Sequence, residues 1–236
     1  MAFSKTVGVI GGMGPEATVD LMTRVIRKTP AVNDQDHLRM LVDNNPKIPS
    51  RIAAIIEGTG ESPVPVLTEM ARGLEVQGAS FLAIPCNTAH VYYSEIQQAV
   101  TIPVLNMVAL AALAASTEIT AQSARRVGLL GSSALSQTGL YEPYCRQVGV
   151  ECLYPDEQQQ ADLMGLINAI KAQNAQPEQL ERYALIARAL AAKGANCLII
   201  ACTELSVVDA ALADDIRRID ALDVLVDHII ASATRH

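Results

Sequence analysis

Two similar segments of the chain each carry a cysteine that could take part in acid–base chemistry. Residues 78–90 read GASFLAIPCNTAH and residues 194–206 read GANCLIIACTELS, so a gapless alignment pairs Cys86 with Cys202. A free thiol has a pKa of about 8.5, and a modest lowering of that pKa makes it a proton acceptor at neutral pH. Two thiols on opposite faces of one carbon could remove a proton from one face and deliver one to the other. The pair therefore predicts racemisation at a carbon atom.

Polar residues directly follow both cysteines. Asn87 and Thr88 follow Cys86, and Thr203 follows Cys202. A carbon atom next to a carboxylate is a weak acid, so the carbanion left after proton removal needs preorganised hydrogen-bond donors around the carboxylate. We therefore expect Asn87, Thr88 and Thr203 to bind the substrate.

The segments around the two cysteines alternate between predicted strands and helices. Residues 6–12 form a short apolar run with β-branched side chains, and Pro15 then begins a helix. Such alternation is typical of parallel α/β sheets, which bind ligands outside the carboxyl ends of their strands. Cys86 and Cys202 both fall at such an end, just before a predicted helix whose N-terminal amides would stabilise a thiolate.

A second repeat indicates that the chain consists of two related halves. The segment that begins at Val7 reads VGVIGGMG and the segment that begins at Val127 reads VGLLGSSA, at nearly the offset that separates the two cysteines. The two matches predict two similar doubly wound parallel-sheet domains from an old duplication. If a pseudo-two-fold axis relates these domains, their strand ends face one another across a cleft, and the two sulfurs approach one ligand from opposite sides.

Composition narrows the possible partners and the compartment. The chain has 236 residues, is 50% hydrophobic and carries a net charge of −7, which permits a large core and argues against nucleic acid as a partner. Apolar runs fall short of the roughly 18 to 20 residues of a membrane span, and the N-terminus lacks the layout of a signal peptide. We therefore expect a cytoplasmic protein with reduced thiols and no membrane partner. Cys145, Cys152 and Cys197 are interpreted as core residues.

Three motifs resemble those of the aspartate/glutamate racemase superfamily, and most closely those of the cofactor-independent aspartate racemases. They are GGMGPEAT at 11–18, PCNTAH at 85–90 and ACTEL at 201–205, and the resemblance covers nearly the whole chain. It implies that Cys86 and Cys202 are the two catalytic bases, with no pyridoxal phosphate, no other cofactor and no metal. It also implies a homodimer whose active site lies between the two domains of each chain.

The Ala-rich stretch over 109–124 predicts a helix at the junction of the two halves, and the resemblance places the end of the chain. A C-terminal helix near 209–233 is expected to pack back on the first half of the chain. The first domain would then comprise residues 1–108 and 208–236, and the second domain would comprise residues 109–207.

Four further residues are assigned to substrate binding by local similarity to the family. The segment NNPKIPSR places Arg51 where an arginine meets a substrate carboxylate, and a guanidinium is well suited to clamp that group. The segment LMGLINAIKAQ points to Lys171 as a second substrate contact. Met13 and Gly14 would line the cleft from the first loop, where glycine lets the backbone approach a ligand closely.

One difference from the family's motifs narrows the range of possible substrates. Glutamate racemases of the superfamily usually carry His after the second Cys-Thr, whereas this chain has Glu204. This difference favours a small acidic amino acid, aspartate, as the substrate, while glutamate or a broader range stays open. The roles of Glu204 and His90 are also open.

Nucleotide binding is one alternative function. Gly12, Gly14 and Ala17 satisfy the G-x-G-x-x-A fingerprint after a first strand, and Asp43 could be its acidic residue. The fingerprint explains neither cysteine, and the second half of the chain has no equivalent G-x-G.

A cysteine hydrolase and a non-catalytic binding protein would also fit a cleft of this kind. Cys86 with His90 could form the nucleophile and base of the hydrolase, which would leave Cys202 without a role. A non-catalytic protein of the same fold could bind small dicarboxylates without turning them over. Maleate isomerase and hydantoin racemase also use two cysteines, but their motifs resemble this chain less closely.

Overall fold

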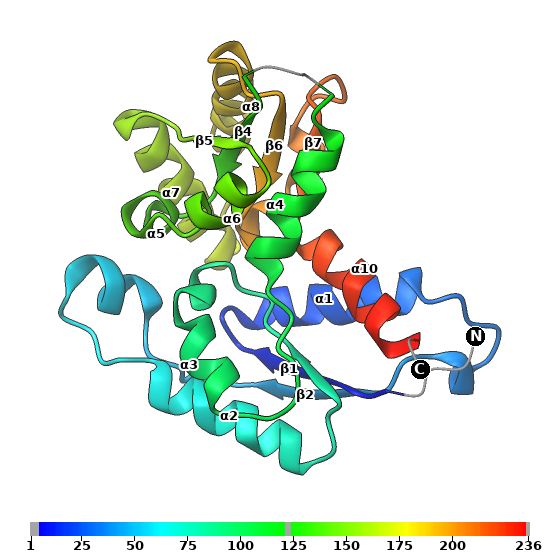
Figure 1. Ribbon diagram of the computed structural model, residues 1–236. Coiled ribbons are helices and arrows are strands. Elements are labelled where there is room, and N and C mark those ends of the chain that lie inside the picture. The colour runs from blue at the N-terminus through cyan, green and yellow to red at the C-terminus, as the bar shows by residue number, and fades with distance from the viewer. Residues whose placement is uncertain (1–4, 121–123, 235–236) are drawn as a thin grey trace. The chain divides into compact units, whose positions relative to one another are not determined.

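The computed structural model describes residues 5–120 and 124–234 (Figure 1). The chain divides into two compact units, of which the first comprises Met1–Met107 with Leu222–His236 and the second comprises Val108–Ala221. Each unit contains a parallel sheet with helices attached. The predicted α/β class with two parallel sheets is therefore confirmed.

The first unit is built on a three-stranded sheet with β1 in the middle. Its strands are β1 (Val7–Gly11), β2 (Met40–Asn44) and β3 (Phe81–Ala83), in the order β2-β1-β3 and all parallel. All five residues of β1 are buried, as expected for an apolar strand that is covered on both faces. A single bridge between Leu82 and Val104 extends the sheet beyond β3.

Helices connect these strands and pack on the sheet. They are α1 (Pro15–Lys28), η1 (Asp34–Asp36), η2 (Ala53–Glu57), α2 (Val64–Val76), η3 (Thr88–Tyr92), α3 (Tyr93–Gln98) and α10 (Ala221–Thr234). α1 begins at the predicted Pro15, and α2 ends just before Gly78, whose φ of 97° is the left-handed conformation that favours glycine.

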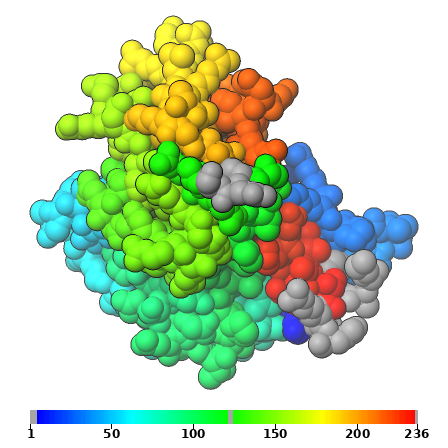
Figure 2. Space-filling model, turned by 45° about the horizontal axis from the view of Figure 1, so that its top comes forward, coloured from blue at the N-terminus to red at the C-terminus, as the bar shows by residue number. Residues whose placement is uncertain are grey.

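The C-terminal helix α10 packs against α1. Arg24 of α1 lies 3.1 Å from Asp223, and Lys28 lies 3.0 Å from Asp227. The apolar face of α10 is fully buried, with Leu225 at 0% exposure. In the space-filling view its red surface borders the blue surface of the first unit (Figure 2).

The second unit has a four-stranded parallel sheet. Its strands are β4 (Arg126–Leu130), β5 (Glu151–Leu153), β6 (Cys197–Ile200) and β7 (Arg218–Asp220), in the order β5-β4-β6-β7. Its helices are α4 (Met107–Glu118), α5 (Ser133–Thr138), α6 (Glu142–Gln147), α7 (Glu157–Lys171), α8 (Pro177–Ala192), α9 (Thr203–Ser206) and η4 (Asp209–Ala211).

The repeat in the sequence corresponds to the same packing in both units. A side chain added at Gly8 of β1 would place its Cβ 2.6 Å from Leu82 of β3, and one added at Gly128 of β4 would place it 2.5 Å from Leu198 of β6. The leucines are partners in the aligned cysteine segments, and the glycines are partners in the second repeat. Each unit therefore has the same contact. A glycine in its first strand makes room for a leucine in the strand that leads to a cysteine.

The end of the chain differs from the expected single helix over 209–233. Residues in this range form η4 and β7 before α10 begins at Ala221. Because β7 pairs with β6 from Arg218 to Asp220, the chain up to Ala221 belongs to the second unit. The expected first domain included all of 208–236, because a three-residue strand with one apolar side chain gives no periodic signal in the sequence.

Of the helices that the described residues form, none combines the length and apolar character needed to cross a membrane.

Candidate active site

Cys86 lies in the loop that follows β3. In parallel α/β sheets, the loops at the carboxyl ends of the strands carry the ligand-binding residues. The side chain of Cys86 is 8% exposed, and it belongs to the same buried apolar cluster as Met13 of the first loop. Asn87 is 4% exposed and immediately precedes η3, which begins at Thr88. The structure therefore brings Met13, Cys86, Asn87 and Thr88 together at one end of the first sheet.

His90 holds the backbone of this loop. Its Nδ1 lies 2.9 Å from the carbonyl oxygen of Cys86, and its Nε2 lies 3.1 Å from the amide nitrogen of Met107. Because a carbonyl only accepts and an amide N–H only donates, we assign the proton to Nδ1 and the lone pair to Nε2. Burial lowers the pKa of His90, which keeps this ring neutral.

These contacts weigh against the cysteine hydrolase. Both ring nitrogens of His90 already bind backbone groups, and the ring stacks on Tyr93 with a centroid separation of 6.3 Å. A neutral histidine held in this way has no lone pair to offer to the thiol of Cys86. His90 therefore orients the loop, which gives it a structural role beside the cysteine.

Arg51 lies just before η2 and approaches the helix that follows Cys86. Its Nη1 donates to the carbonyl oxygen of Pro49 at 3.1 Å, and its Nε is buried with no hydrogen-bond partner among the described residues. Burial raises the pKa of Tyr92 in η3, and the positive charge of Arg51 opposes that shift. Arg51 thus presents an unused donor near the Cys86 loop, as a residue that binds a carboxylate would.

The glycines of the first loop are accounted for by contacts within the protein. Gly12 has a φ of 92°, and a Cβ there would lie 2.3 Å from the backbone of Asn45. The Gly12 amide donates to Oγ1 of Thr18 at 2.9 Å, and Gly14 immediately precedes α1. The match to a dinucleotide fingerprint is therefore explained by packing of the loop on Asn45 and Thr18.

Cys202 lies at the equivalent end of the second sheet, between β6 and α9. It immediately precedes α9, whose first residue, Thr203, is 4% exposed. The Cys202 thiol donates to Oε2 of Glu204 at 3.0 Å, and Oε1 of Glu204 lies 3.7 Å from Nζ of Lys171. The structure therefore joins Lys171, the last residue of α7, to the cysteine loop through Glu204.

This environment favours the protonated form of the Cys202 thiol. Burial raises its pKa well above the ordinary value, and the negative charge of Glu204 and the hydrogen bond to it raise the pKa further. The positive charge of Lys171 opposes these effects. The expected stabilisation of a thiolate by helix amides is outweighed here, because α9 is only one turn long and a carboxylate contacts the sulfur.

The sequence left the role of Glu204 open and offered His90 only as the base of the alternative hydrolase. The +4 spacing of His90 from Cys86 suggested proximity, but not that its ring would bind the backbone on both sides. Glu204 drew notice only as a departure from the histidine of glutamate racemases. Its contact with Cys202 depends on the direction of two side chains, for which the sequence carries no signal.

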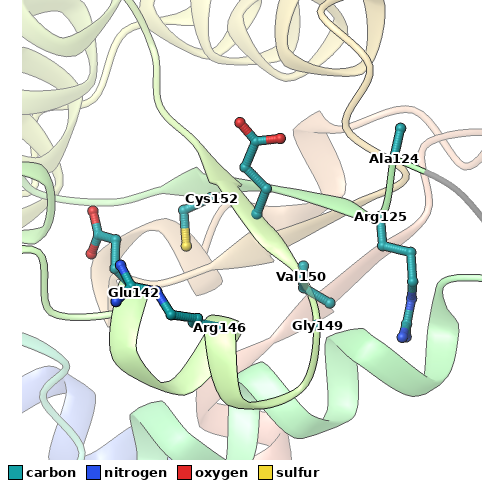
Figure 3. Close-up of a pocket in the computed structure, with 8 residues that line it drawn as sticks. Ala124, Arg125, Glu142, Arg146, Gly149, Val150 and Cys152 are labelled. Atoms are coloured by element: carbon teal, nitrogen blue, oxygen red, sulfur yellow. The ribbon is translucent and has the colours of Figure 1, made fainter.

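The remaining cysteines lie outside these two clusters. Cys197 is buried within β6, as predicted for a core residue. Cys145 of α6 is 1% exposed, and its interaction with Cys152 in β5 lowers the pKa of Cys145 and raises that of Cys152. Figure 3 shows the sulfur of Cys152 directed toward α6 in a cavity of about 440 Å³ within the second unit. None of the residues predicted for the active site lines this cavity.

Within residues 5–120 and 124–234, no group of three or more His, Cys, Asp or Glu side chains is arranged to hold a metal ion.

Comparison with known proteins agrees with the motifs. The profile of the Asp/Glu/Hydantoin racemase family matches residues 10–229. The chain is 29% identical to the broad specificity amino-acid racemase RacX of Bacillus subtilis (strain 168), over 96% of this chain and 97% of that protein.

Solved structures give the same assignment. An aspartate racemase of Picrophilus torridus superposes with a TM-score of 0.85 at 31% identity, over 99% of this chain and 96% of that chain. An aspartate racemase homologue from Pyrococcus horikoshii OT3 shares the fold, with a TM-score of 0.76 at 22% identity over 98% of this chain and 100% of that chain. The chain therefore belongs to the Asp/Glu/hydantoin racemase family of isomerases.

Proposed function

We propose that the protein is a cofactor-independent racemase that interconverts L- and D-aspartate, with Cys86 and Cys202 as the two acid–base groups. The observation that carries the proposal is the equivalence of the two cysteines. Each follows the strand that pairs with the first strand of its own sheet, β3 beside β1 and β6 beside β4. Membership of the racemase family and the 31% identity to an aspartate racemase support it.

The proposed reaction passes a proton through the α-carbon from one side to the other. One sulfur, as thiolate, removes the Cα proton, and the opposite thiol delivers its own proton to the other face of the carbanion. For the reverse direction the two sulfurs exchange roles. This mechanism requires that both sulfurs contact one substrate.

The surrounding residues would bind and polarise the substrate. Arg51 supplies a buried guanidinium donor for one carboxylate. Lys171 supplies a positive charge in the Cys202 cluster for the other. Asn87, Thr88 and Thr203 would donate hydrogen bonds that strengthen as negative charge develops, and Met13 and Gly14 would close the site on the side of the first loop.

A broader amino-acid racemase is the second candidate. The similarity to a broad specificity racemase of Bacillus subtilis favours it. Glu204 in place of histidine, together with two cations for two carboxylates, favours aspartate. A panel of L-aspartate, L-glutamate and L-alanine separates the two: a preference for aspartate supports the first candidate, and comparable rates on all three support the second.

Cysteine variants test the mechanism against a non-catalytic dicarboxylate-binding protein. We expect the protein to racemise L-aspartate without pyridoxal phosphate, as followed by chiral chromatography, and C86S and C202S each to abolish turnover. C197A, which removes a buried thiol from β6, is the matched control and should retain activity. A dicarboxylate-binding protein would show binding but no turnover in any form. The homodimer that the resemblance implies stays a prediction, which sedimentation equilibrium checks.

A further inference from the structure

We propose that Glu204 is the proton partner of Cys202, so that a Cys202 thiolate forms only opposite a protonated Glu204. The inference rests on the proposed function, since it concerns one of the two proposed acid–base groups. Glu204 acts through the cysteine and not on the substrate, which makes it a positioning residue. The separation of 3.0 Å between the sulfur and Oε2 is the contact on which the proposal depends.

Charge limits the states that this contact allows. A carboxylate only accepts hydrogen bonds, so the hydrogen in the observed contact lies on the sulfur. A thiolate beside an ionised Glu204 would place two negative charges 3.0 Å apart in a partly buried site. Such like-charge pairs do not both ionise readily. If the proton moves to Oε2 instead, the carboxyl donates back to the thiolate, and the pair keeps a single negative charge.

The other groups near Cys202 are consistent with a pair of this kind. Lys171 of α7 lies 3.7 Å from the second oxygen of Glu204 and balances the single charge. Tyr183 of α8 stays neutral, because burial raises the pKa of its hydroxyl and the negative charge of a Cys202 thiolate would raise it further. The remaining charged groups of this region have partners of their own: Asp209 binds Arg218, and Asp220 binds Ser206.

With this pair, the number of protons is the same before and after each turnover. Before turnover in one direction, Cys86 is a thiol and the pair holds one proton, which shifts from the sulfur to Glu204. The Cys202 thiolate takes the Cα proton, and Cys86 delivers its proton to the opposite face. Afterwards Cys86 is a thiolate and the pair holds two protons, one on each member. The reverse reaction follows the same states backwards, as microscopic reversibility requires.

The test measures the reactivity of Cys202 without turnover. In a C86S background, the alkylation rate of Cys202 by iodoacetamide is followed against pH, with the modified residue identified by peptide mass spectrometry. E204Q should accelerate alkylation at pH 7.5 by about tenfold or more, because loss of the neighbouring charge lowers the pKa of the thiol by roughly a unit or more. K171M should slow it. E178Q, an exposed charge change in the first turn of α8, is the control and should leave it unchanged.

The second arm measures racemisation with Cys86 intact. In the direction of racemisation in which Cys202 is the acid, E204Q should move the alkaline limb of the kcat/KM profile to lower pH, since the more acidic Cys202 thiol loses its proton earlier, and E204D should restore part of the shift. The proposal would be overturned if E204Q lowered the rate of racemisation without moving the alkaline limb of the pH profile. It would also be overturned if E204Q left the alkylation rate of Cys202 unchanged. A wild-type protein that racemises no amino acid would refute the proposed function instead, whatever the alkylation data show.

Discussion

The two cysteines occupy equivalent positions, but their sulfur atoms have different neighbours. Four residues after each cysteine, a side chain binds the cysteine's own carbonyl oxygen: Nδ1 of His90 lies 2.9 Å from that of Cys86, and Oγ of Ser206 lies 3.4 Å from that of Cys202. Both halves of the repeat thus share a hydrogen bond from a side chain to the carbonyl oxygen of the cysteine. The contact of Glu204 with the sulfur is particular to Cys202. The two thiols therefore differ chemically, although the aligned sequences make them look alike.

Stability at acid pH should depend on His90. Burial depresses the pKa of this ring in the folded state, whereas an unfolded histidine titrates at about 6.5. Below about pH 6.5 His90 binds a proton in the unfolded chain but not in the folded chain. The contribution of His90 to the free energy of unfolding is therefore fully present above about pH 6.5, and it falls by up to about 1.4 kcal/mol per pH unit as the pH decreases. In urea unfolding between pH 8 and pH 5, H90Q should show a shallower loss of stability than the wild type. Parallel curves would contradict a buried neutral ring.

Substrate affinity should depend on the guanidinium of Arg51. A lysine at this position keeps the charge but loses the planar donor set, including the buried Nε. Hydrogen bonds to a charged group contribute about 1.5–3 kcal/mol, so R51K should raise KM for L-aspartate roughly tenfold or more. R72K on an exposed face of α2 is the control and should leave KM unchanged. An unaltered KM in R51K would remove Arg51 from the site.

At the scale of elements, the strands that carry the site were predictable and the edge of the second sheet was not. The strands that lead to Cys86 and Cys202 are buried apolar runs, and their place before a helix follows from the alternation of the chain. β7 escaped prediction because its three residues alternate charged, apolar and charged. Its place in the sheet is decided by pairing with β6, which is a tertiary contact.

The first loop should be sensitive to the addition of one methyl group. Gly12 has a φ of 92°, and a Cβ there would meet the Asn45 backbone at 2.3 Å, so G12A adds both strain and overlap. We expect it to destabilise the protein by more than about 1–3 kcal/mol, the cost of an unfavourable backbone conformation alone. G73A in the last turn of α2 meets no neighbour within 4 Å and should stabilise the protein by about 0.4–1 kcal/mol. Denaturant unfolding of both variants checks the contrast, and equal effects would contradict the loop geometry.

At the scale of the whole molecule, each unit holds one of the two cysteines and one of the two cations that are assigned to the substrate. The chain as a whole carries a net charge of −7, so it repels an anionic substrate unless positive charge is placed locally. Arg51 in the first unit and Lys171 in the second would supply that charge under the proposed function. The duplicated sequence predicted the two sheets and the matched cysteines, but distances such as that between Lys171 and Glu204 are set by side-chain packing and lie beyond a pattern of residue types.

The most direct test of the central claim follows hydrogen at the α-carbon of the substrate. L-Aspartate is incubated with the protein in deuterated water without pyridoxal phosphate, and both enantiomers are separated and analysed by mass spectrometry. With one thiol on each face, the D-aspartate formed should carry a deuteron at Cα from its first appearance, while L-aspartate recovered early keeps its proton. If neither L-aspartate nor L-glutamate exchanges its Cα hydrogen, the two cysteines do not perform this reaction, and the racemase proposal is wrong.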